Sequence, residues 1–154
     1  MRRVVRPWDN MRFFKKLSEK EEDPVPVVND PQLGRMEWSE DDEAWVGTHG
    51  GFRFALAYER KATPTPPLLS YAKEVLSNPV WLERTLEEEK KRWASKVPPS
   101  GRDELATLKF GLIYFSIHKD RGPYIFAIVE GGGDDRSWRI EYHNRQCDGL
   151  GFDT

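Results

Sequence analysis

The chain has 154 residues and nearly balanced charge, with 24 Lys and Arg against 26 Asp and Glu. This length suits one domain with a hydrophobic core of its own. The charge balance excludes the basic excess typical of general nucleic-acid-binding proteins, so we expect no nucleic-acid partner. Aromatic residues make up 12% of the chain, which excludes an intrinsically disordered protein.

The sequence carries no pattern of a targeting or membrane segment. Residues 1–7 are basic, but no apolar run follows them as it does in a signal peptide. No stretch approaches the roughly 20 apolar residues of a membrane-spanning helix, so we expect no membrane partner. The single cysteine, Cys147, cannot form an intrachain disulfide, which favours a reducing compartment. We therefore expect a cytoplasmic protein.

The N-terminal part of the chain differs in pattern from the rest. Residues 8–21 predict a short amphipathic helix, because Asp9 is a suitable N-cap and apolar residues follow it at helical spacing. The proline-bearing stretch 18–31 predicts a linker. We therefore divide the chain into an N-terminal helical arm and linker, residues 1–30, and a single α+β domain, residues 31–154.

Six segments alternate apolar and polar residues, or are apolar on both faces, as β-strands do. They are residues 35–38, 44–48, 52–59, 109–118, 124–130 and 137–143. Short links join the last three, which predicts an antiparallel meander. The apolar residues on both faces of 109–118 and 124–130 predict central strands in the sheet.

Two helices are predicted between the third and fourth strands. Thr65 and Asn78 are N-cap candidates, and each precedes a proline that a first helical turn accepts. The charged run 87–92 has Glu and Lys or Arg four residues apart, which predicts a solvated helix face. Residues 103–108 add a helical turn. The predicted fold is α+β, an antiparallel sheet of about six strands with a central two-helix block packed on one face.

Glycine-rich residues 131–133 follow a strand, but they do not predict a phosphate-binding loop. Asp134 and Asp135 come next, and two carboxylates repel a phosphate. The segment is typical of a hairpin turn. We find no other cofactor motif, so we expect no cofactor.

A metal or catalytic alternative rests on four side chains, His118, His143, Cys147 and Asp148. His143 and Cys147 have a spacing that zinc ligands adopt, although the paired cysteines of structural zinc sites are missing. Cys147 acting as a nucleophile needs one of the histidines as its base. This alternative predicts a small metal-binding protein or enzyme.

Charged turns on a rigid scaffold favour a non-enzymatic protein-binding module over the metal-binding alternative. The candidate binding residues are Asp41, Asp42, Glu43, Asp134 and Asp135. A second copy of the chain, paired through an edge strand, is another possible partner. A third alternative is a small-ligand pocket lined by Trp38, Trp45 and Trp138. The strand aromatics are predicted to face the core, which argues against an RNA-binding sheet.

Four motifs follow one another along the chain. They are G-x-x-x-W at residues 34–38, W-x-G at 45–47, a proline-bounded helical block ending in Trp at 66–93, and D-G-x-G at 148–151. Together they resemble a group of bacterial α+β domains of unknown function, over residues 33–154. The resemblance implies no catalytic residue. It implies an immunity-like or stress-associated protein that acts by binding another protein.

Overall fold

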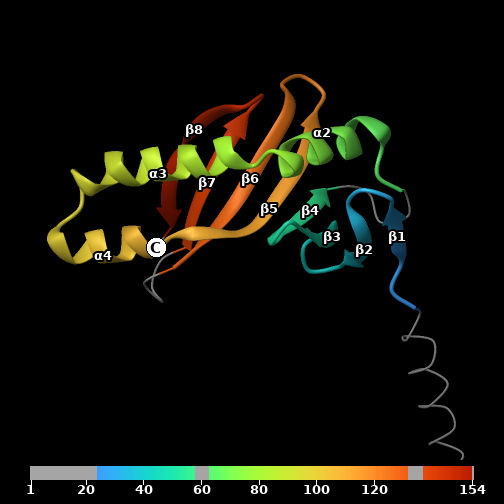
Figure 1. Cartoon of the computed structure of the whole chain (residues 1–154), viewed down its shortest axis with the longest axis horizontal. Coiled ribbons are helices and arrows are strands. Elements are labelled where there is room, and N and C mark those ends of the chain that lie inside the picture. The colour runs from blue at the N-terminus through green and yellow to red at the C-terminus, as the bar shows by residue number, and fades with distance from the viewer. Residues whose placement is uncertain (1–23, 58–62, 132–136, 154) are drawn as a thin grey trace, which may run out of the picture.

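The computed structural model describes residues 24–57, 63–131 and 137–153, which form a mixed β-sheet with helices on one face (Figure 1). The strands are β1 (Val27–Asp30), β2 (Gly34–Ser39), β3 (Ala44–His49), β4 (Phe52–Ala57), β5 (Lys109–His118), β6 (Gly122–Glu130), β7 (Ser137–His143) and β8 (Gln146–Asp153). The helices are α2 (Pro66–Ser77), α3 (Val80–Ala94) and α4 (Pro99–Thr107). The N-terminal helix expected over residues 8–21 lies outside the described residues.

The eight strands lie side by side in the order of the sequence, from β1 to β8. All neighbours are antiparallel except β4 and β5, which pair in parallel. β4 and β5 can pair in parallel because the chain between them is long: α2, α3 and α4 cross over the sheet before β5 begins. The predicted fold is therefore wrong in three respects. In the described chain the sheet has eight strands rather than six, it is mixed rather than antiparallel, and three helices rather than two accompany it.

Each element that was not predicted has a local sequence that is atypical of its secondary structure. β1 lies in the proline-bearing stretch expected to be a linker, and it pairs with β2 from Val27↔Glu37 to Asp30↔Gly34. β8 contains Gly149 and Gly151, which have low strand propensity. The helical turn predicted near residue 103 is the end of a longer helix, α4, which begins at Pro99.

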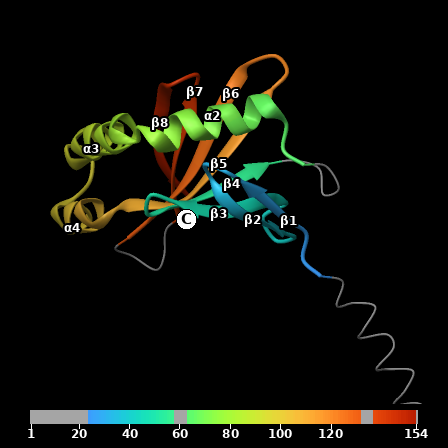
Figure 2. The ribbon, with the colours of Figure 1, turned by 45° about the vertical axis from the view of Figure 1, so that its right-hand side comes forward.

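The core lies between the sheet and the helices. Figures 1 and 2 show α2 crossing β4 and β5, with α3 continuing towards β8. Strand residues such as Phe54, Phe115 and Ile140 are fully buried against this layer, and α2 contributes Val75. The aromatic rings meet edge to face, with Tyr71 and Phe115 centroids 5.8 Å apart.

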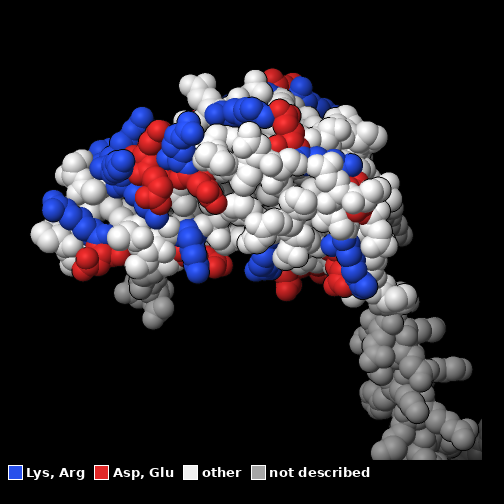
Figure 3. Space-filling model, viewed as in Figure 1, with Lys and Arg blue, Asp and Glu red and all other residues white. Residues whose placement is uncertain are grey.

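The charged run on α3 is only partly solvated. Figure 3 shows both signs intermingled over this helix. Glu89 and Lys90, however, are buried, at 7% and 9% exposure. The ion pairs join residues three apart, Lys90 to Glu87 and Arg92 to Glu89, rather than four apart as predicted. Glu89 is buried where its carboxylate accepts a backbone hydrogen bond from the edge strand β8.

Side chains of α3 bind the backbone of the edge strand β8. The Trp93 Nε1–H donates to the Leu150 carbonyl at 2.7 Å, and the Leu150 N–H donates to Glu89 Oε2 at 3.3 Å. An edge strand otherwise leaves such groups free to pair with another chain. At Leu150, therefore, the helix satisfies the outer edge of β8.

The β1–β2 turn is joined to α2 through one carboxylate. Asp30 Oδ1 accepts the backbone N–H groups of Gln32 and Leu33 at 2.8 and 2.9 Å. Its Oδ2 lies 2.9 Å from Lys73 Nζ on α2. Burial opposes ionisation of Asp30, but the backbone hydrogen bonds and Lys73 outweigh it and lower the pKa. Asp30 thus fixes the first hairpin against the helical layer.

No helix within the described residues combines the length and apolar character needed to cross a membrane.

Candidate functional site

The sheet face opposite the helices carries an aromatic and apolar band. In the pairing register, Ala55 lies beside Tyr114, Tyr114 beside Phe126, and Phe126 beside Glu141. None of the described helices packs on this side of the sheet (Figure 2). We call it the open face; its members on β4 to β7 are Arg53, Ala55, Leu112, Tyr114, Ser116, His118, Tyr124, Phe126, Ile128, Arg139, Glu141 and His143.

The open face has a small apolar cluster of its own. Ala44, Ala55 and Leu112 are buried there, and Val46 and Tyr114 pack against them. The rings of Tyr114 and Phe126 lie 6.0 Å apart. We expected the strand aromatics to face the core, but Tyr114, Tyr124 and Phe126 face the other way. The apolar residues on both sides of β5 and β6 were the signal for this second apolar surface.

The acidic turn between β2 and β3 lies at the rim of the open face. The Tyr114 hydroxyl donates to Asp42 Oδ1 at 2.8 Å, and the Ser39 hydroxyl donates to Asp42 Oδ2 at 2.8 Å. Burial, and then the Asp42 carboxylate, raise the pKa of Tyr114 to about 12, so its hydroxyl stays protonated as a donor. Asp41 and Glu43 are exposed beside it. Of the other predicted binding residues, Asp134 and Asp135 lie outside the described part of the chain.

Three of the four side chains in the metal or catalytic alternative meet at one end of the open face. The Tyr124 ring lies between His118 and His143, 4.7 Å from each ring centroid. His143 Nδ1 is hydrogen-bonded to the Asp148 carboxylate. Burial, and then the neighbouring Glu141, raise the pKa of Tyr124 to about 12. Tyr124 is the member of this cluster that the sequence analysis missed.

Cys147 lies on the opposite face of the sheet from the histidines. It pairs with Tyr142 in the register and packs against the main core. Burial raises the pKa of the thiol to about 11, so Cys147 is protonated at neutral pH and is a poor nucleophile or metal ligand. Within the described ranges, no group of three or more His, Cys, Asp or Glu side chains is arranged to hold a metal ion.

The three tryptophans expected to line a pocket are packing residues in the core. Trp38 and Trp45 contact each other edge to face at 5.5 Å, on neighbouring strands β2 and β3. Trp138 lies on β7, at 2% exposure, and its Nε1–H donates to Glu104 Oε1 at 2.8 Å. The Trp38–Trp45 pair on β2 and β3 and Trp138 on β7 fill separate parts of the core.

Comparison with protein-family models, with curated proteins and with solved structures gives no match. The resemblance to bacterial domains of unknown function therefore stays a prediction.

Proposed function

We propose that this chain is a non-enzymatic, cytoplasmic protein-binding domain that holds its partner against the open face. The observation that carries the proposal is the adjacent pair Tyr114 and Phe126, half-buried rings on a face that no described helix covers. The single cysteine, Cys147, supports the cytoplasmic location. An immunity-like role agrees with this mode of action and rests on the resemblance alone.

The layout of the open face suits a protein interface. Aromatic and aliphatic side chains occupy the middle, and charged groups such as Arg53, Arg139 and Glu141 flank them on neighbouring strands. Protein interfaces commonly have such an apolar centre with a polar rim, and aromatic residues dominate their binding energy. The rigid sheet keeps the rings in place before binding, which lowers the entropic cost of association.

An enzymatic role is less well supported by the same geometry. His143 is oriented by Asp148, as a catalytic base is, but the thiol expected to react lies on the other side of the sheet.

The acidic turn between β2 and β3 fits the binding proposal in part. Asp42 is held by Tyr114 and Ser39, which leaves Asp41 and Glu43 as the exposed acidic groups of that turn.

A photo-crosslinking experiment tests the location of the binding surface. Benzoylphenylalanine is placed at Phe126 on the open face or at Val80, an exposed position on the helix side. We expect the Phe126 probe to capture a defined partner protein from the native cell extract and the Val80 probe to capture none of it. A partner captured equally from both positions, or only from Val80, would contradict the proposal.

A further inference from the structure

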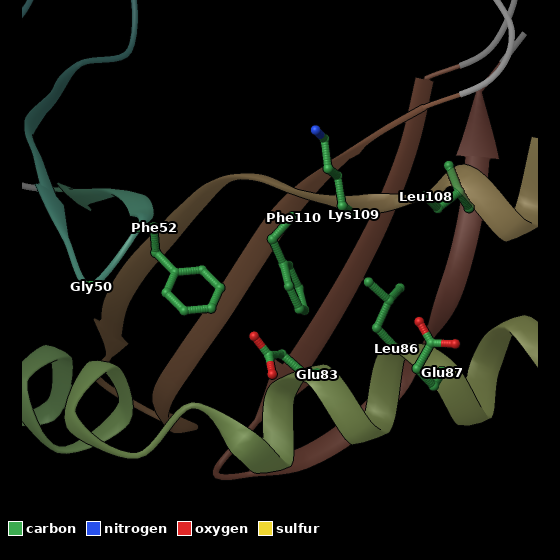
Figure 4. Close-up of a pocket in the computed structure, with 9 residues that line it drawn as sticks. Gly50, Phe52, Glu83, Leu86, Glu87, Leu108, Lys109 and Phe110 are labelled. Atoms are coloured by element: carbon green, nitrogen blue, oxygen red, sulfur yellow. The ribbon is translucent and has the colours of Figure 1, made fainter.

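A groove of about 500 Å³ lies on the helix side of the molecule, away from the open face (Figure 4). It is bounded by α3, by the turn between β3 and β4, and by the start of β5. Its apolar walls are Phe52, Phe110, Leu86 and Leu108. The groove is therefore an opening into the layer between the sheet and α3.

Two glutamates of α3 border this part of the sheet, on either side of the buried Leu86. Phe52 and Phe110 project from the sheet towards the helix, with ring centroids 6.3 Å apart. The helix closes the core here with Leu86 and presents the exposed Glu83 and Glu87, one turn apart, at the rim of the groove. Gly50 in the turn adds no side chain. As a result both rings stay half-exposed.

The charge in the groove is negative. Figure 4 shows the Glu83 carboxylate directed from α3 towards the space between the two rings. Within the described chain no Lys or Arg forms an ion pair with Glu83, whereas Glu87 lies 2.9 Å from Lys90 Nζ. Lys109 also borders the groove, but its ammonium points away from it (Figure 4). A ligand that fills the groove meets aromatic rings on one side and a carboxylate on the other.

We propose that this groove binds a small organic cation that carries a methylated ammonium group. Such a cation is attracted to the faces of aromatic rings, and it loses less hydration energy on burial than a primary ammonium. Glu83 supplies the opposite charge from the helix side. The volume of about 500 Å³ falls within the range of small-ligand sites and leaves room for a substituent on the ammonium.

Choline and its neutral isostere, 3,3-dimethylbutan-1-ol, test the proposal on the full chain. In a titration followed by amide NMR shifts, we expect choline to perturb Gly50 and Gly51, and to bind about tenfold more tightly than the neutral alcohol. Equal binding of the two compounds would show an apolar groove without cation recognition. Absence of choline shifts at 50-fold excess over about 1 mM protein would also overturn the proposal.

Matched variants separate the site from general effects on folding. Glu83→Gln and Phe110→Leu are each expected to weaken choline binding about fivefold to tenfold, since one removes the charge and the other an aromatic face. Glu88→Gln changes an exposed carboxylate of α3 outside the groove and is expected to leave binding unchanged. Unchanged binding in Glu83→Gln, with the fold intact by circular dichroism, would contradict the proposal. This test is independent of binding at the open face.

Discussion

Replacing Trp93 with alanine is expected to lower the free energy of unfolding by about 3 kcal/mol. The Trp93 ring packs edge to face with Trp138 and Phe152, with both centroids 5.5 Å away. Its indole N–H also donates to the Leu150 carbonyl of the edge strand β8. The alanine variant leaves a cavity beside the two rings and an edge carbonyl without its partner, so the packing and hydrogen-bond losses add. Urea unfolding followed by circular dichroism measures the change.

Phenylalanine at the same position separates the two contributions. Trp93→Phe keeps most of the ring packing and removes the hydrogen bond, so we expect a loss of about 1 kcal/mol. Equal losses in Trp93→Phe and Trp93→Ala would mean that the hydrogen bond to β8, rather than ring packing, accounts for the stability. Losses below about 0.5 kcal/mol in both variants would show that α3 does not hold β8 in place.

Replacing Asp30 with alanine is expected to lower the free energy of unfolding by about 2–3 kcal/mol. The Asp30 side chain is only 8% exposed, and it binds two backbone N–H groups and Lys73. Alanine leaves the N–H of the buried Leu33 without an acceptor. Asp30→Asn keeps an oxygen for the turn and loses only the ion pair, so it should cost about 1 kcal/mol. A smaller loss in the alanine variant than in the asparagine variant would contradict this account.

The lowered pKa of Asp30 predicts that the free energy of unfolding falls at acidic pH. Because folding lowers the pKa of Asp30, the unfolded chain binds its proton more readily. The stabilisation is therefore present above the unfolded pKa, near 3.9, and is lost as the pH falls through the lower folded value. Asp30→Asn should lose less stability than the wild type between about pH 5 and pH 2. Parallel curves for the two proteins would exclude Asp30 as a source of acid sensitivity.

The strands and helices that could be predicted are those whose pattern of apolar, polar and capping residues lies within the segment itself. Strands β2 to β7 alternate or are apolar on both faces, and α2 begins at a proline that follows Thr65. β8 could not be predicted, because its glycines are poor strand formers and its edge is held by α3, about 60 residues away in the sequence. The parallel pairing of β4 with β5 likewise depends on where the helical layer returns the chain.

The arrangement of the candidate catalytic residues depends on the turn and the register of the β7–β8 hairpin. The two-residue turn pairs Tyr142 with Cys147, which places the thiol on the core face. Glu141 then pairs with Gly149, so Asp148 is the extra residue of a β-bulge, and its carboxylate reaches His143. Residue spacing alone does not show at which residues the chain turns. The sequence therefore grouped Cys147 with the histidines, although they lie on opposite faces.

The affinity of the partner for two matched variants tests the central claim most directly. Phe126→Arg places a charge in the middle of the open face, whereas Val80→Arg makes the same kind of change on the exposed helix side. With the purified partner in a calorimetric titration, we expect Phe126→Arg to raise the dissociation constant roughly 30-fold and Val80→Arg to leave it within about twofold. The contrary result, a folded Phe126→Arg variant that binds as tightly as the wild type, would mean that the partner is held elsewhere on the molecule.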